Sequence, residues 1–141
     1  MRAAVTVVAL ATVLLAACTK DPSWNFAHYV LSPVPPSVTN LRVYRIGHSW
    51  GESTLMFAFE ATPFDLEKIR SSRDFYEIHP EKSGGAQLET PRLWLKMAES
   101  AGFAPMEATR YFGCAAKDEP CAYYLFIGAD GRSARFIRFR Y

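Results

Sequence analysis

The C-terminal stretch AYYLFIGADGRSARFIRFRY, residues 122–141, contains two strand-like runs on either side of an Asp-Gly turn. Ala122–Ile127 and Ala134–Tyr141 are rich in aromatic residues, which are enriched in β-strands. Asp130-Gly131 is the strongest short hairpin signal in the chain, because these two residue types readily adopt the positive φ angles of tight hairpin turns. The stretch therefore predicts an antiparallel hairpin.

The residues upstream extend this hairpin into a larger sheet. Apolar and alternating patterns predict four more strands, at residues 41–46, 53–61, 75–78 and 108–112. The first two of these runs are separated by a short stretch that contains Gly47 and Gly51, so they are expected to form a second hairpin.

Two Thr-Pro pairs mark the starts of helices. Thr62-Pro63 places an N-cap threonine before a proline at the first helical position, and Asp65 follows as the acid of the first turn. Thr90-Pro91 repeats the signal before an apolar helix face that Gly102 terminates. The whole pattern predicts an α+β fold, with a mainly antiparallel β-sheet of about five to six strands and two short helices packed on one face.

The first 17 residues have a different character from the rest of the chain. Met1-Arg2 is a short positive start, and Ala3–Ala17 is an apolar run interrupted only by two threonines. A run of about 15 residues is shorter than the ~20 that span a bilayer comfortably. Residues 1–17 therefore read as a secretory signal peptide.

The end of this run is more specific. Leu15-Ala16-Ala17-Cys18 resembles the lipobox of bacterial lipoproteins. The resemblance implies cleavage before Cys18, lipidation of its thiol, and anchoring of the mature chain to the cell envelope, facing the periplasm. Thr19 is not the aspartate associated with inner-membrane retention, so the resemblance favours the outer membrane.

Residues 18–37 carry four of the nine prolines of the chain. Proline removes backbone donors and favours extended conformations, so this stretch is expected to be a membrane tether, followed by a single domain at residues 38–141. Trp24, Phe26 and Tyr29 are unusual in a spacer. They are expected either to pack onto the domain or to rest at the lipid interface, where aromatic rings are favourable.

Cys114 and Cys121 remain as an even pair once Cys18 carries lipid. They bracket a polar turn between two apolar runs, and the exported location favours oxidation. We therefore expect a disulfide that closes a hairpin loop. The spacing of the cysteines is not that of a redox or zinc motif, and the histidines lie in separate segments, so no metal site and no cofactor is expected.

Gly47-His48-Ser49-Trp50-Gly51 has the spelling Gly-x-Ser-x-Gly of the nucleophile elbow in serine hydrolases. An elbow requires a helix after the serine, whereas the pattern here predicts a strand, so a loop between two strands is the favoured interpretation. A triad of Ser49, His79 and either Asp65 or Asp74 nevertheless has the required chain order. A small serine esterase is therefore kept as an alternative function.

Two groups of residues are candidates for contact with a protein partner. His48, Trp50 and Glu52 lie in the loop expected between the first two strands. Arg138 and Arg140 share one face of the last strand and alternate with aromatic residues, a composition typical of interface hot spots. The alternative for the arginines is a charged edge strand that discourages unwanted pairing.

The formal net charge of the chain is only +2, which, together with export, argues against nucleic acid as a partner. The leading hypothesis is a lipid-anchored periplasmic binding protein without catalysis, such as an inhibitor or immunity protein against a cell-wall-active enzyme. Its expected partners are the membrane, through the N-terminal lipid, and another protein. An envelope-assembly or scaffold lipoprotein is a further alternative.

Overall fold

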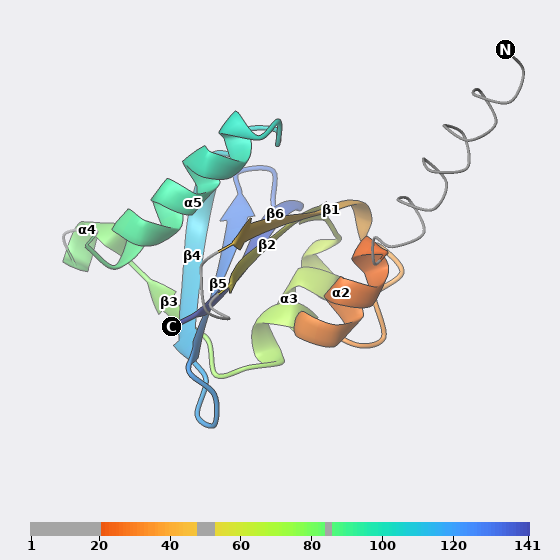
Figure 1. Cartoon of the computed structure of the whole chain (residues 1–141), viewed down its shortest axis with the longest axis horizontal. Helices are drawn as coiled ribbons and strands as arrows, with labels where there is room; N and C mark the ends of the chain where they lie inside the picture. Colours follow the sequence, from red (N-terminus) through yellow and green to blue (C-terminus); the bar gives the residue numbers. More distant parts are fainter. Residues whose placement is uncertain (1–20, 48–52, 84–85) are drawn as a thin grey trace, which may run out of the picture.

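The computed structural model describes residues 21–47, 53–83 and 86–141, and it contains one six-stranded antiparallel sheet (Figure 1). The strands lie in the order β1-β2-β6-β5-β4-β3. Their bounds are Thr39–Gly47 for β1, Ser53–Glu60 for β2, Tyr76–Ile78 for β3, Ala108–Ala115 for β4, Cys121–Gly128 for β5 and Ser133–Arg140 for β6. The predicted α+β class and antiparallel sheet are confirmed.

The hairpin of β5 and β6 forms the centre of this sheet. Gly131 has a φ of 68° in the connecting turn, which glycine adopts without the steric cost that other residues carry. The outer side of β6 then pairs with β2, from Thr54 opposite Phe139 to Glu60 opposite Ser133. The C-terminal strand therefore joins the β1–β2 hairpin to the β3–β4–β5 part of the sheet.

Four α-helices and one 3-10 helix accompany the sheet in the part of the chain that the structure describes. Their bounds are Pro22–Tyr29 for α2, Pro63–Ser71 for α3, Pro80–Ser83 for α4, Ala86–Leu88 for the 3-10 helix η2 and Glu89–Ser100 for α5. The predicted start of α3 is confirmed, because the Thr62 hydroxyl accepts the backbone N–H of Asp65 at 3.3 Å.

Helix α5 begins earlier and ends as predicted. Its N-cap position is Leu88, which makes no side-chain cap, so the prediction that Thr90 caps this helix is wrong. At the other end Gly102 has a φ of 95°. The N–H groups of Gly102 and Phe103 donate to the carbonyls of Glu99 and Ala98, each at 3.0 Å, which is the Schellman ending that a glycine favours.

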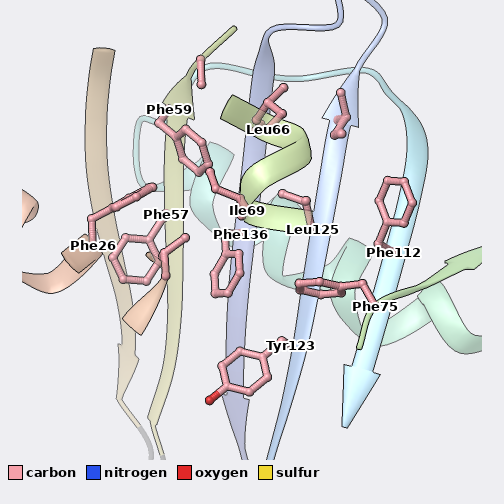
Figure 2. Close-up of a cluster of buried hydrophobic side chains, with 14 of the residues drawn as sticks. Phe26, Phe57, Phe59, Leu66, Ile69, Phe75, Phe112, Tyr123, Leu125 and Phe136 are labelled. Atoms are coloured by element: carbon pink, nitrogen blue, oxygen red, sulfur yellow. The ribbon is translucent and has the colours of Figure 1, made fainter. Parts of the chain in front are cut away.

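The two predicted helices lie on opposite faces of the sheet, so the prediction that both pack on one face is wrong (Figure 1). Helices α2 and α3 bury Phe26, Leu66 and Ile69 against one face, where Figure 2 shows the phenylalanine rings gathered beside α3. Helix α5 buries Trp94 and Ala98 against the other face. The central strands are consequently apolar on both sides, and β2 is buried from Thr54 to Phe59.

The proline-rich segment is part of the domain from Asp21 onward, and the prediction of a tether is wrong for residues 21–37. Phe26 of α2 is 0% exposed and makes edge-to-face contacts with Phe57 and Phe59, at centroid distances of 6.1 and 5.1 Å. The Ser37 hydroxyl donates to Asp65 Oδ2 at 2.6 Å. The physical reason is apolar burial, since a fully buried phenylalanine contributes about 1.5–3 kcal/mol.

Candidate functional site

The loop expected to carry His48, Ser49, Trp50 and Glu52 lies outside the described residues. Its flanks are described: Gly47 ends β1 and pairs with Ser53, which begins β2. A strand, rather than the helix of a nucleophile elbow, therefore follows this loop.

The other members of the alternative triad belong to different parts of the molecule. His79 follows β3 at the opposite edge of the sheet from β1, and three strands separate β2 from β3. At ~4.8 Å per strand this places β3 about 19 Å from β2. His79 Nδ1 lies 3.4 Å from the Glu81 carboxylate.

The two candidate carboxylates have partners of their own. Asp65 is buried at the start of α3, where the hydrogen bond from Ser37 is the main cause that holds its pKa below the ordinary value. Asp74 is exposed and lies 2.9 Å from Lys117 Nζ. The local environment explains Asp65 as a contributor to structure, whereas Asp74 forms an exposed ion pair, which contributes little stability.

The arginines predicted to contact a partner lie on β6, which is a central strand rather than the edge strand considered above. Arg138 and Arg140 share the α3 face, as expected from their spacing. Arg138 is largely covered, with its guanidinium 4.9 Å from the Tyr29 ring centroid and 3.9 Å from Glu119. Only Arg140 of the two is exposed to solvent.

The predicted disulfide is not present in the structure, where Cys114 and Cys121 are free, buried thiols. Cys114 lies opposite Tyr123, and Cys121 lies beside Ala116, whose N–H donates to the Cys121 carbonyl at 2.9 Å. The cysteines are thus diagonal neighbours on one face. Diagonal positions are ~7–8 Å apart between Cα atoms, which exceeds the usual reach of a disulfide. Burial raises the pKa of both thiols.

An open cavity of about 310 Å³ lies beside the β4–β5 hairpin on the α3 side. Several of its charged lining groups are already paired. Arg73 donates to the carbonyls of Tyr29 and Val30, at 2.7 and 2.8 Å, and Lys117 pairs with Asp74. The two hydrogen bonds of Arg73 thus tie the end of α2 to the segment after α3.

The opposite face of the sheet carries a different feature, an aromatic surface beside Trp94 of α5. We call it the tyrosine surface, and it consists of Tyr76, Tyr124, Phe139 and Tyr141. Tyr124 and Phe139 point to the α5 side from β5 and β6, while Tyr76 comes from β3 at the edge of the sheet and Tyr141 follows β6.

Ring contacts that include Trp94 of α5 link Tyr124, Phe139 and Tyr141. Trp94 of α5 lies 6.1 Å from Tyr124 and 4.9 Å from Phe139 between ring centroids, and Phe139 lies 5.9 Å from Tyr141. Tyr76 lies over Gly113, because a Cβ at this glycine would be 3.5 Å from the Tyr76 hydroxyl. Gly113 is the cross-strand partner of Tyr124, so the glycine makes room for the Tyr76 ring beside it.

The tyrosine surface combines exposed and half-buried tyrosines. Tyr76 is 54% exposed and Tyr141 is 59% exposed, whereas Tyr124 is half-buried between them. Burial raises the pKa of Tyr124, and the neighbouring phenols of Tyr76 and Tyr141 raise it further. The Tyr124 hydroxyl is neutral near pH 7, as tyrosine hydroxyls ordinarily are, and is able to donate or accept a hydrogen bond.

Sequence reasoning missed this surface, although part of its signal is visible. Phe139 and Tyr141 are two residues apart and therefore point to the same side of β6. Tyr124 and Tyr76 join them only through the strand order and the register, which the sequence does not reveal. Arg138 and Arg140, which were predicted as partner-binding residues, lie on the opposite face of β6.

Within residues 21–47, 53–83 and 86–141, no group of three or more His, Cys, Asp and Glu side chains is arranged to hold a metal ion. In the same ranges, no helix has both the length and the apolar character needed to cross a membrane. Comparison of the chain with protein-family models, with curated proteins and with solved structures finds no match.

Proposed function

We propose that this chain is a lipid-anchored envelope protein that acts by binding another protein through the tyrosine surface, without catalysis of its own. The anchor is the lipid on Cys18, and the domain faces the periplasm, with the outer membrane as the favoured location. The lipobox-like stretch that ends at Cys18 supports the anchor.

The observation that carries the binding proposal is the exposure of two large aromatic side chains around a covered one. Tyrosine is enriched at interface hot spots, because its rigid ring buries a large area and its hydroxyl adds a directional hydrogen bond. Tyr76 and Tyr141 are both more than half exposed, and they flank Tyr124. The contacts of Trp94 and Phe139 hold Tyr124 and Tyr141 in place before a partner arrives, which reduces the entropy cost of binding.

The proposed partner is a cell-wall-active enzyme or toxin, and the chain is its inhibitor or immunity protein. A small exported domain with a rigid aromatic surface is suited to covering part of another protein. A protein of this kind protects its cell only when the enzyme is present. Deletion is therefore expected to leave growth in monoculture unchanged and to sensitise cells to secretions of competing bacteria, whereas a scaffold lipoprotein would cause a growth or permeability defect in monoculture.

Affinity capture tests the surface directly. The full-length protein, purified from membranes, is incubated with envelope extracts and with secretions of competing bacteria, and Kd is then measured for each retained protein. Tyr76→Ala together with Tyr141→Ala is expected to weaken binding at least about 30-fold, which corresponds to the ~2 kcal/mol of a hot spot.

Phe64→Ala is the matched control, since Phe64 is 70% exposed but lies on α3, at the opposite face of the sheet. This variant is expected to bind as the wild type does. Equal binding by the double tyrosine variant, or equal loss in the Phe64 variant, would contradict the proposed role of the tyrosine surface.

A further inference from the structure

Helix α2 begins very close in sequence to the proposed lipid. Asp21 is the N-cap residue of α2, and its carboxylate accepts the backbone N–H of Ser23 at 3.1 Å. Only Thr19 and Lys20 separate it from Cys18. Three residue steps span at most about 10 Å, so a lipid on Cys18 keeps the start of α2 within that distance of the membrane surface.

Helix α2 has a fixed orientation on the domain. Phe26 holds one side of the helix in the core. The Arg73 guanidinium binds the carbonyl groups at its end, those of Tyr29 and Val30, as a cation does favourably at a helix C-terminus. The same side of α2 is therefore always presented outward.

That outward side carries two stacked aromatic rings. Trp24 and His28 are one turn apart, with centroids 5.0 Å apart and planes inclined by only 8°. The His28 ring also meets Tyr29 edge-on at 4.5 Å. Trp24 is 46% exposed and His28 is exposed, which presents an indole at the end of the domain nearest the proposed lipid.

We propose that the outward face of α2, formed by Trp24 and His28, rests in the headgroup region of the membrane that holds the lipid anchor. This inference depends on the proposed lipid anchor at Cys18. Tryptophan favours the interface because its ring is apolar while its N–H still reaches a polar partner. The short distance from the lipid supplies a high effective concentration of membrane surface, so a single exposed indole is sufficient for a lasting contact.

Tryptophan fluorescence in brominated lipid tests this contact. The full-length chain is produced in a bacterium, purified from membranes and reconstituted in vesicles of phosphatidylethanolamine and phosphatidylglycerol, with ordinary or brominated acyl chains. Brominated lipid is expected to quench the wild-type emission, and Trp24→Phe is expected to lose most of that quenching.

A second variant keeps the number of tryptophans constant. Trp24→Phe together with Tyr76→Trp moves the reporter to β3, at the other edge of the sheet, and this variant is expected to resist quenching. Circular dichroism confirms that both variants are folded.

Two results would overturn the inference. One is equal quenching of the wild type and Trp24→Phe, and the other is strong quenching of the variant with tryptophan at position 76. The mass of the purified chain shows whether Cys18 carries lipid, and it therefore distinguishes a missing membrane contact of α2 from a missing lipid anchor. Unmodified Cys18 overturns both proposals, whereas lipidated Cys18 with unchanged quenching overturns only the membrane contact of α2.

Discussion

Arg73 connects three parts of the molecule through one guanidinium group. It donates to the carbonyls at the end of α2, and it stacks on Tyr123 of β5 and Phe136 of β6, at 4.5 and 5.3 Å from the ring centroids. Planar stacking combined with two hydrogen bonds suits arginine and not lysine. This residue therefore holds the N-terminal segment on the sheet.

Arg73→Ala is expected to lower the free energy of unfolding by about 1.5–3 kcal/mol, the range for losing hydrogen bonds to a charged group. Arg73→Lys should recover only part of this loss, because an ammonium group cannot reproduce the stacked geometry. Urea denaturation measures both changes. Arg45→Ala, on the exposed part of β1, is the control and should change stability by less than about 0.5 kcal/mol; equal effects at the two arginines would contradict the role of Arg73.

Asp130 stabilises the β5–β6 turn through its carboxylate. Its Oδ2 accepts the Ser133 hydroxyl at 2.6 Å, and its Oδ1 accepts the N–H groups of Arg132 and Ser133 at 2.9 and 2.8 Å. These bonds, led by the Ser133 hydroxyl, lower the pKa of Asp130 from 3.8 to about 2. Because the folded pKa is the lower one, the stabilisation is present above about pH 4 and is lost as the pH falls toward 2.

A carboxyl ¹³C NMR titration checks this prediction and should give Asp130 a midpoint of about 2. Asp130→Asn should reduce the loss of stability between pH 4 and pH 2 in denaturation experiments. A midpoint near the ordinary 3.8 would show that the hydrogen bonds to the Asp130 carboxylate do not form in solution. The same conclusion would follow if the variant lost as much stability between pH 4 and pH 2 as the wild type.

At the scale of elements, local signals in the sequence were sufficient to predict all six described strands and α3. The Asp-Gly turn, the Thr62 cap and the Gly102 ending act through neighbouring backbone groups, so the sequence contains their physical cause. Helix α2 has the same kind of start, with Asp21 as cap and Pro22 at the first position. The surrounding prolines favoured the prediction of an extended tether instead of this helix. The stability of α2 comes from the contacts of Phe26 with β2, which is distant in the sequence.

Phe26→Ala tests whether α2 belongs to the domain. Removal of a fully buried phenylalanine ring is expected to cost about 3–5 kcal/mol in the free energy of unfolding. Trp24→Ala, on the exposed side of the same helix, is the matched control and should cost less, about 0.5–1.5 kcal/mol in the absence of membranes, the range for a lost aromatic stacking contact. If urea denaturation showed similarly small effects for Phe26→Ala and Trp24→Ala, residues 21–37 would be the tether that their proline content predicts.

The β4–β5 hairpin sets the state of the two cysteines. Their diagonal register and burial predict two free thiols in the folded protein. Alkylation after denaturation, without reductant, is expected to label both Cys114 and Cys121 in mass spectrometry. A species lacking two hydrogens and resistant to alkylation would show that the hairpin register differs from the one described, because the bond requires the two Cα atoms to come closer.

At the scale of the whole molecule, a sheet covered on both faces was the main feature that the sequence did not reveal. The alternation in β2 identified Leu55, Phe57 and Phe59 as one face, and Met56 and Ala58 on the other side are buried as well. Which helix covers which face depends on the path of the chain between strands. The tyrosine surface depends on the same unseen strand order, because β3 brings Tyr76 toward the α5 side of β5.

The sheet also separates the proposed membrane contact of α2 from the Tyr76 end of the tyrosine surface. Helix α2 contacts β1, whereas Tyr76 belongs to β3 at the other edge (Figure 1). Five strand spacings of ~4.8 Å separate these edges by about 24 Å. A domain whose α2 face rests on the membrane therefore holds the Tyr76 edge away from the lipid, where a periplasmic partner is able to reach it.

Photo-crosslinking in living cells tests the central claim, that the anchored protein binds its partner through the tyrosine surface. Benzoylphenylalanine is placed at position 76, or at position 64 as a control on α3 that is even more exposed. During exposure to secretions of a competing bacterium, irradiation is expected to give a discrete protein adduct from position 76 and none from position 64. No adduct from position 76, or the same adduct from both positions, would contradict the account.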